Sequence, residues 1–300
     1  MYRPHTDMTT PFWIRLFPLG FHPYLRLARY DRPIGLWLLF LPCLWSFSLA
    51  RAKENIPFDY FLIFLFFLGA LLTRGMGCTM NDLIDRKIDR LVSRTATRPL
   101  ALGSLSLQNA LLFLGVQIFL SFIIASFLGS DIILLGGVFL FLIGLYPWMK
   151  RWTFWPQLFL GVVFNGGIVM AWKASHLSFS LDVFLLYGAA LFWTVGYDTI
   201  YGTQDYVEDK VLGLKSTAIL FENYLKYFVF ACFFMTVLLL GLIGVRGNFF
   251  SLYYWFLGAL FFSFSFQVFK LEQKRPEICL SIFQEQRWVG LWIWMMLLVA

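Results

Sequence analysis

Long runs of uncharged, mostly apolar residues recur along the whole chain, separated by short polar segments. Most of these runs are close to the length, about 20 residues, that a helix needs to cross a hydrocarbon layer. Because lipid offers the backbone no hydrogen-bond partner, runs of this kind are expected to be helical. The pattern predicts nine transmembrane helices, at about residues 33–50, 58–80, 107–128, 131–146, 158–172, 181–201, 224–245, 249–269 and 288–300.

Composition agrees with this pattern. Of the 300 residues, 60% are hydrophobic and 14% are charged, and the mean hydropathy is +0.72. We therefore expect an all-α polytopic membrane protein whose helices form a bundle. Residues 1–32 are basic and contain several prolines, which predicts a cytoplasmic or interfacial arm that precedes a single transmembrane domain at residues 33–300. The four cysteines lie in or beside apolar runs and are expected to be reduced packing residues.

The net charge of +7 is unevenly distributed between alternate loops. If the N-terminus is cytoplasmic, the outside loops hold only Arg51, Lys53, Lys173 and Arg246, so 24 − 4 = 20 of the Lys and Arg residues lie inside. This bias is typical of the positive-inside rule and predicts a cytoplasmic N-terminus. It explains the basic balance without nucleic acid, which we do not expect as a partner.

An acidic cluster follows the second apolar run. Asp82, Asp85 and Asp89 are spaced by three and four residues, which places them on one face of a helix. Asn81 lies at the edge of that face, and Arg74 lies two turns earlier. Like charges at positions 85 and 89 repel each other, so a shared cation is expected. The alternative is an exposed helix at the membrane surface with interleaved charges.

A second acidic cluster closes the sixth apolar run. Asp198, Asp205 and Asp209 are spaced by seven and four residues, again on one helical face, with Glu208 beside them. Seven of the 17 acidic residues lie in these two short stretches. The predicted topology puts both clusters on the cytoplasmic side. Two facing clusters of this kind favour binding of divalent cations.

Carboxylates at a membrane boundary suit Mg²⁺, which takes one or two protein carboxylates together with phosphate oxygens. Two clusters could hold two ions around a diphosphate, and nearby cations would neutralise the remaining charge. The candidates are Arg74, Arg94, Arg98, Lys150 and Arg151. A diphosphate site at the surface of an apolar helix bundle favours a substrate whose diphosphate carries a lipid tail. Within the predicted span, Arg74 either faces a cavity or extends to the surface.

Aromatic side chains occur at helical spacing in the sixth run, at Trp193, Tyr197 and Tyr201. Ring faces can stabilise a cation while the pocket around it excludes water. These residues are therefore candidates for the lining of a pocket in which diphosphate leaves an allylic carbon. Ordinary packing is the alternative for such a stripe.

Several segments resemble one family in order along the chain. NDLIDRKIDR (81–90) is similar to the NDxxDxxxD signature of the UbiA superfamily of intramembrane prenyltransferases, and YDTIYGTQDYVEDKVLGLKSTAI (197–219) is similar to its second aspartate motif. Five further segments resemble the branch of the family that prenylates 4-hydroxybenzoate. These are RYDRPIG (29–35), RGMGCTMND (74–82), SRTATRPLALG (93–103), YPWMKRWTFWPQ (146–157) and GLKSTAI (213–219).

The resemblance implies nine helices around a central cavity, two Mg²⁺ ions and a polyprenyl diphosphate donor. The implied reaction prenylates 4-hydroxybenzoate at the carbon ortho to its hydroxyl, in ubiquinone biosynthesis, with membrane lipid as a further partner. The implied catalytic residues are Asp82, Asp85, Asp89, Asp205 and Asp209, and the implied metal ligands are Asn81, Asp85, Asp89, Asp205 and Asp209. The implied substrate-binding residues are Arg74, Asn81, Arg94, Arg98, Lys150, Arg151, Asp198 and Tyr201. The sequence QDYVED is less acidic than some versions of the second motif, so the two ion sites could differ in affinity.

Several questions stay open at this point. The acceptor could be a naphthoate, homogentisate, haem or chlorin, and an ion-coupled transporter is a more distant alternative. Arg29, Arg32 and Arg74 are candidates for binding the acceptor carboxylate, while the base that removes the ring proton is not identified. The expected location is a bacterial inner membrane, with the mitochondrial inner membrane as the alternative. Prenyl chain length and oligomeric state are not predicted.

Overall fold

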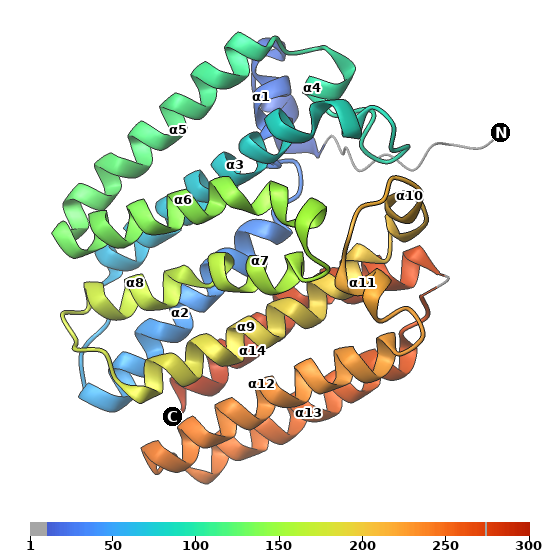
Figure 1. Cartoon of the computed structure of the whole chain (residues 1–300). Helices are drawn as coiled ribbons and strands as arrows, with labels where there is room; N and C mark the ends of the chain where they lie inside the picture. The colour runs from blue at the N-terminus through green and yellow to red at the C-terminus, as the bar shows by residue number, and fades with distance from the viewer. Residues whose placement is uncertain (1–10, 274) are drawn as a thin grey trace. The chain divides into compact units, whose positions relative to one another are not determined.

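The computed structural model describes residues 11–273 and 275–300, and the described chain is helical, without strands (Figure 1). The first ten residues of the predicted arm lie outside this range. The helices before residue 153 are η1 (Phe12–Leu16), η2 (Leu19–Phe21), α1 (His22–Leu27), α2 (Ile34–Glu54), α3 (Tyr60–Asp89), α4 (Pro99–Leu102), α5 (Leu107–Leu128) and α6 (Ser130–Trp152). The later helices are α7 (Pro156–Phe164), α8 (Gly166–Ala174), α9 (Leu181–Gly202), α10 (Tyr206–Val211), α11 (Thr217–Leu220), α12 (Leu225–Gly247), α13 (Ser251–Lys270) and α14 (Pro276–Leu298).

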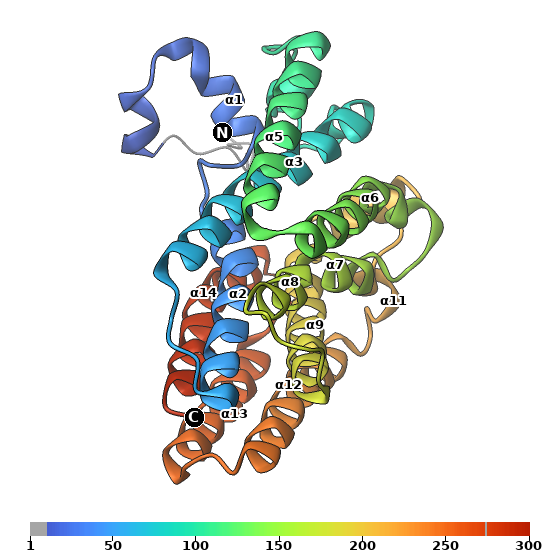
Figure 2. The same ribbon diagram turned by 90° about the vertical axis from the view of Figure 1, so that its left-hand side faces the viewer.

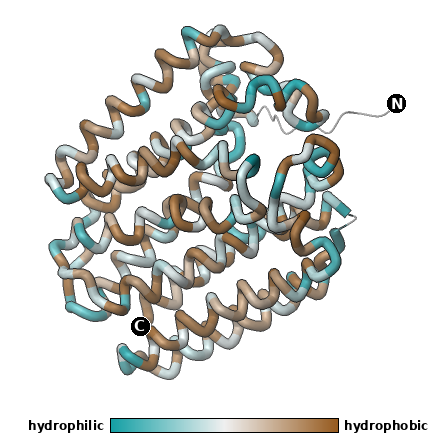
Figure 3. Tube along the Cα trace, in the orientation of Figure 1, coloured by the Kyte–Doolittle hydropathy of each residue, from teal (hydrophilic) through white to brown (hydrophobic). Residues whose placement is uncertain are grey.

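Eight segments of the described chain are long and apolar enough to span a membrane, close to the nine predicted. They are α2, α3, α5, α6, α7 together with α8, α9, α12 and α13. Figure 3 shows these helices mostly in the brown of hydrophobic residues. The helix α14 is not among the eight, because its first half contains Glu277, Glu285 and Arg287. It begins twelve residues before the predicted ninth span at 288. The chain is an integral membrane protein with an all-α fold.

Two local predictions need correction. The fourth span extends beyond its predicted end at residue 146, because α6 continues through Pro147 to Trp152. Proline is tolerated in membrane helices when the freed backbone groups find other partners. The fifth span is broken at Asn165, where α7 ends and α8 begins. The Asn165 side chain nitrogen donates to the Gly161 carbonyl at 2.8 Å, which gives a backbone acceptor at the break a partner.

The length of α3 determines where the first acidic cluster lies. This helix has 30 residues, which corresponds to about 45 Å, whereas a hydrocarbon core is about 30 Å thick. A helix of this length therefore extends beyond the hydrocarbon at one end or both. The residues from Asn81 to Asp89 form its polar C-terminal end. They are therefore expected at the membrane boundary, not at mid-span.

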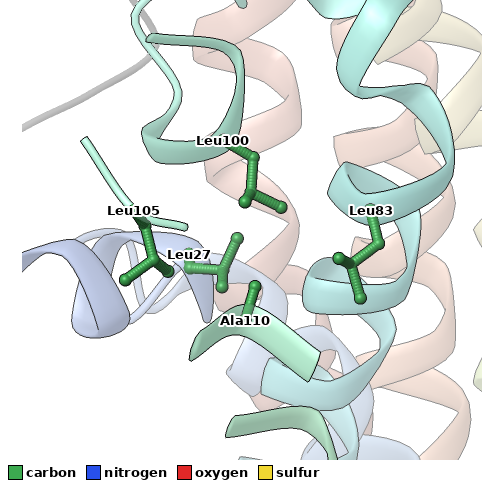
Figure 4. Close-up of a cluster of buried hydrophobic side chains, with 5 residues drawn as sticks. All are labelled: Leu27, Leu83, Leu100, Leu105 and Ala110. Atoms are coloured by element: carbon green, nitrogen blue, oxygen red, sulfur yellow. The ribbon is translucent and has the colours of Figure 1, made fainter. Parts of the chain in front are cut away.

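The chain divides into two compact units, with the divisions falling inside α2, α3 and α6. The first unit joins the segment that ends at Leu36 with Phe67–Pro147. Its buried apolar cluster joins α1, α3 and α5 with α4 and the turn after it (Figure 4). The cluster consists of Leu27, Leu83, Leu100, Leu105 and Ala110. It packs the end of the N-terminal arm against the helix that carries the first acidic cluster.

The second unit consists of Trp37–Phe66 and Trp148–Ala300. Within it α9 packs against α7, α12 and α14, and α12 runs beside α13 (Figures 1 and 2). At the start of α9, the Asp182 carboxylate lies 2.9 Å from Arg246 of α12 and 3.3 Å from Lys53 of α2. These ion pairs fix one end of the helix whose other end carries the second acidic cluster.

Candidate active site

The first acidic motif occupies the last three turns of α3. The carboxylates of Asp82 and Asp85 are fully buried, Asp89 is 5% exposed, and Asn81 is partly exposed. Burial of three carboxylates within eight residues requires compensating positive charge or metal, because an isolated buried charge is very costly. The alternative of an exposed, solvated helix therefore does not describe this segment.

Two arginines from elsewhere in the same unit bind this motif. The Arg29 guanidinium donates to both carboxylate oxygens of Asp82, at 2.7 and 2.9 Å. Arg98 donates to Asp82 at 3.2 Å and to both oxygens of Asp89 at 3.1 Å. Arg98 thus lies at the first motif, and its contact with diphosphate stays a prediction. Arg29 was expected to bind an acceptor carboxylate, but in this structure it binds a carboxylate of the protein itself.

Arg74 lies four turns before the end of α3 and contacts the backbone of Gly35. A Cβ atom built at Gly35 would overlap the Arg74 guanidinium, so glycine at this position makes room for the charge. The guanidinium is only partly exposed. Arg94, in the loop after α3, is also partly exposed, and Thr95 beside it donates to the Asp89 carbonyl at 2.9 Å. Their contacts with substrate stay predictions.

The second acidic motif begins at the end of α9 and continues into α10. Asp205 is the residue before α10, and the Asp209 amide donates to its carbonyl at 2.8 Å. Asp198, Asp205 and Asp209 are partly exposed, in contrast to the buried aspartates of the first motif. Gly213 has φ +69°, which allows the chain to turn directly after α10. The motif is therefore a short, tightly turned segment.

Lys150 and Arg151 lie in the last turn of α6, and the end of this helix contacts the segment after α10. The Lys215 amide donates to the Lys150 carbonyl at 2.8 Å, and the Lys215 ammonium donates to the Trp152 carbonyl at 3.2 Å. The Arg151 guanidinium lies 4.6 Å from the centre of the Trp148 ring, a cation–π distance. Within this unit, the predicted basic pair is thus tied to the segment that follows the second motif.

A buried polar network beneath the second motif was not predicted. The side-chain oxygen of Gln157 (Oε1) accepts a hydrogen bond from the Thr217 backbone amide at 3.0 Å. The Thr217 and Thr199 hydroxyls are 2.6 Å apart. All three side chains are 5% exposed or less. The network joins α7, α9 and α11, and so fixes both ends of the loop that carries the motif. Apolar periodicity gives no signal for such residues, because their partners are distant in sequence.

The aromatic stripe of α9 lies within a packed cluster. Trp193 is fully buried, and its ring centre is 5.0 Å from those of Trp45 and Tyr197. Tyr201 is partly exposed, with its ring centre 4.5 Å from that of Phe283. Trp193 therefore serves helix packing, and Tyr201 remains the better candidate for contact with substrate.

The donor chemistry of both motifs fits Mg²⁺. Asn81, Asp85 and Asp89 are four residues apart on α3, and Asp205 and Asp209 are four apart across the start of α10, all with oxygen donors. Among the described residues, no three Asp, Glu, His or Cys side chains are grouped as a metal site. Mg²⁺ commonly takes only one or two protein carboxylates and completes its shell with water and phosphate oxygens. A metal held together with diphosphate therefore fits these residues.

Comparison with known proteins identifies the family. The model of the UbiA prenyltransferase family matches residues 39–297. The chain belongs to this family. It is 42% identical over 279 residues to the mitochondrial 4-hydroxybenzoate polyprenyltransferase of Bos taurus, which covers 93% of this chain and 75% of that protein. It is also 42% identical over 275 residues to the enzyme of the same name from Homo sapiens, covering 91% of this chain and 74% of the relative.

Solved structures of the UbiA family share the fold. A UbiA homologue from Aeropyrum pernix K1 has a TM-score of 0.74 at 24% identity and covers 88% of this chain and 97% of that one. A homologue from Archaeoglobus fulgidus, bound to GPP and Mg²⁺, has a TM-score of 0.68 at 17% identity and covers 93% of this chain and 100% of the other. At these identities the likeness establishes the fold, in agreement with the sequence-based expectation. The relatives at 42% identity are named mitochondrial, so the expected bacterial inner membrane is not borne out.

Proposed function

We propose that this chain transfers a polyprenyl group from polyprenyl diphosphate to the ring carbon ortho to the hydroxyl of 4-hydroxybenzoate. The observation that carries the proposal is the 42% identity, over more than nine-tenths of the chain, to enzymes named for this reaction. Both aspartate motifs lie inside the matched region. The product is then a precursor of ubiquinone.

Mg²⁺ is the proposed cofactor, with Asn81, Asp85 and Asp89 holding one ion and Asp205 and Asp209 the other. When bound, Mg²⁺ neutralises the diphosphate and makes it a better leaving group. Support comes from the oxygen donors at four-residue spacing in both motifs, and from the Archaeoglobus fulgidus homologue bound to GPP and Mg²⁺.

The protein's own cations assist the departure of diphosphate. Arg98 is already at the first motif, 3.1 Å from the Asp89 carboxylate, and Lys150 and Arg151 lie beside the segment that follows the second. We assign all three, with Arg74 and Arg94, to binding of the diphosphate oxygens, because charge-assisted contacts with phosphate are strong. Asp198 and Tyr201 are assigned to the substrate side of α9, where both are partly exposed.

The bond changes follow from the substrates. The allylic carbon–oxygen bond breaks, and the electron pair leaves with diphosphate. The ortho carbon of the acceptor ring then attacks the allylic cation, a carbon–carbon bond forms, and the ring proton passes to a base. The chain's contribution is to orient the two substrates and to exclude water, which would otherwise capture the cation.

The test is an assay of membranes that contain the protein, with radiolabelled 4-hydroxybenzoate and a polyprenyl diphosphate. We expect a prenylated product of the predicted mass that disappears on addition of EDTA and returns with excess Mg²⁺. Asp85→Ala membranes should form no product. Full activity of this variant would refute its role, and prenylation of a naphthoate or homogentisate instead would identify a different acceptor.

Location is part of the proposal. We infer a mitochondrial membrane, the alternative left open by the sequence, because the relatives at 42% identity are named mitochondrial. Fractionation of source cells with an antibody to the protein tests this inference. Recovery in any other membrane would contradict it.

A further inference from the structure

Asp82 contacts both Arg29 and Arg98, and Asp89 also contacts Arg98. Asp82 is fully buried and accepts three hydrogen bonds from two arginines, two of them from Arg29 at 2.7 and 2.9 Å. Both of the Arg29 contacts come from one guanidinium nitrogen, Nη2, while Nη1 donates to the Arg26 carbonyl at 3.0 Å. Hydrogen bonds between charged partners such as these are stronger than those between neutral groups. A carboxylate bound in this way is largely occupied by protein donors.

The contacts continue from Asp82 to Asp89. Arg98 bridges the two carboxylates, at 3.2 Å from Asp82 and 3.1 Å from Asp89. The result is an ionic chain in the order Arg29, Asp82, Arg98 and Asp89. Its two positive and two negative charges cancel, and each residue is 9% exposed or less. Charge balance is what allows such a group to be buried, because removal of one partner leaves an uncompensated charge.

The ionic chain connects three segments that are far apart in the sequence. Arg29 lies at the end of the N-terminal arm, Asp82 on α3, and Arg98 directly before α4. Leu27 also packs with Leu83 of α3 and Leu100 of α4 in one apolar cluster (Figure 4). Charged and apolar contacts therefore hold the same three segments together.

The backbone conformation at Arg29 is set by the end of α1. Its φ is +59°, in the left-handed region that residues other than glycine rarely adopt. The same guanidinium also donates to the carbonyl of Arg26 at 3.0 Å. A conformation of this kind persists only where surrounding contacts determine it. Here the contacts are those of the Arg29 and Tyr30 amides, which donate to the Arg26 and Leu25 carbonyls at 3.0 and 2.9 Å and so end α1. The direction in which the Arg29 side chain leaves the helix is therefore fixed.

We propose that Asp82 is a positioning residue, which holds the arm through Arg29 and the loop before α4 through Arg98. In this role it fixes Arg98 against Asp89, and so sets the geometry of the diphosphate site without binding metal or substrate itself. The proposal rests on the proposed function only for its effect on activity. It also assigns Arg29 to the support of Asp82, so that the acceptor carboxylate is bound by other groups.

Hydrogen–deuterium exchange of the purified protein in lipid nanodiscs tests the structural part. We expect Asp82→Asn and Arg29→Gln to speed exchange of peptides that cover residues 22–32 by about tenfold, since local opening depends on the lost contacts. Asp182→Asn, which alters a buried aspartate paired with Arg246 and Lys53 in the second unit, should leave these peptides unchanged. Peptides of α12 serve as a reference for global unfolding, and Arg275→Gln, which breaks the exposed Arg275–Glu272 pair, is the matched arginine control.

Either of two exchange results would overturn the proposal. One is unchanged exchange of the arm in Asp82→Asn, and the other is equally faster exchange of the arm in Asp182→Asn. Neither result depends on the acceptor, because no substrate is present. Failure of the proposed function would therefore leave this measurement intact.

A double-mutant cycle in kcat/KM tests the link to catalysis. We expect Asp82→Asn and Arg29→Gln each to lower kcat/KM about 30-fold. The double variant should lose at most about 100-fold relative to the natural protein, because the two residues act as one unit. Arg29→Lys, which keeps the charge but lacks the fork, should recover part of the loss. A double variant near the product of the single effects, about 1000-fold, would show independent roles and refute the proposal.

Discussion

Thr217 joins the segment after the second motif to the helix bundle through two short hydrogen bonds. Its hydroxyl lies 2.6 Å from the Thr199 hydroxyl, and its backbone amide donates to the Gln157 side chain at 3.0 Å. Removal of the hydroxyl would leave Thr199 with one partner fewer in a fully buried position. We therefore expect Thr217→Val to lower the free energy of unfolding by about 1–3 kcal/mol. Thermal unfolding in detergent measures the change. Thr217→Ser, which keeps the hydroxyl, should lose less than half as much, and equal losses would contradict the role of the hydrogen bond.

Tyr30 makes stability depend on pH at the alkaline end. This residue lies between α1 and α2, and burial raises the pKa of its phenol from 10 to about 12. The folded protein therefore keeps the neutral form above pH 10, while the unfolded chain ionises. Stability from this residue is complete below pH 10 and falls between pH 10 and 12, by at most about 1.4 kcal/mol per pH unit.

The variant Tyr30→Phe isolates this effect. It also loses the bond from the phenol to the Leu71 carbonyl, at 3.1 Å, so it should be less stable than the natural protein at pH 8. The difference between the two should shrink as the pH rises toward 12. A constant difference between pH 8 and pH 11.5, measured by thermal unfolding, would show that Tyr30 does not titrate as expected.

At the level of single residues, spacing identifies the acids but not the groups that support them. Asp82, Asp85 and Asp89 were predicted because a helical period places them on one face. The Arg29 partner of Asp82 is 53 residues away, and no local pattern indicates the pairing. The same holds for Gln157 and Thr217, whose contact crosses 60 residues. Burial decides these pairings, and burial depends on the whole fold.

Among the elements, α9 and α12 approach closely at Gly196. A Cβ atom at this position would lie 2.6 Å from a ring atom of Phe233, which is itself 1% exposed. We therefore expect Gly196→Ala to destabilise the protein by about 1–3 kcal/mol, because the packed ring cannot move freely. Gly258, in α13, has open space where a Cβ would be.

The matched control is Gly258→Ala. A helix gains about 0.5–1 kcal/mol when alanine replaces an interior glycine without steric conflict. This variant should therefore be as stable as the natural protein or more so, in the same thermal unfolding measurement. Destabilisation by both variants to the same degree would show that the α9–α12 contact is not specific.

Helix positions were largely predictable, whereas helix interruptions and extensions were not. The predicted range 107–128 coincides with α5, where the run is bounded by Ser106, which caps the helix, and by Gly129. Asn165 interrupts an apolar run that hydropathy treats as continuous, because its side chain bonds to the backbone and to Thr194 at 2.9 Å. The helix α14 begins at Pro276 because a polar segment can be helical outside the hydrocarbon.

For the whole molecule, the positive-inside rule predicts a cytoplasmic N-terminus. Two exposed positions in the second unit test it, Asn248 after α12 and Lys210 in α10. In sealed vesicles of known orientation, a membrane-impermeant maleimide should label Asn248→Cys only from the outside and Lys210→Cys only from the cytoplasmic side. The native cysteines are all buried, so background labelling should be low. Labelling of both positions from the same side would contradict the topology.

Gly35, near the start of α2, helps to determine the position of a charged group on α3. The Arg74 guanidinium occupies the space that a side chain at position 35 would fill. A single added methyl group at position 35 would force that charge to move. We therefore expect Gly35→Ala to raise KM for the diphosphate substrate, and we expect the same of Arg74→Ala. The substitution at position 35 would have this effect although it changes neither charge nor polarity. The size of the residue at position 35 thus determines where the Arg74 guanidinium lies.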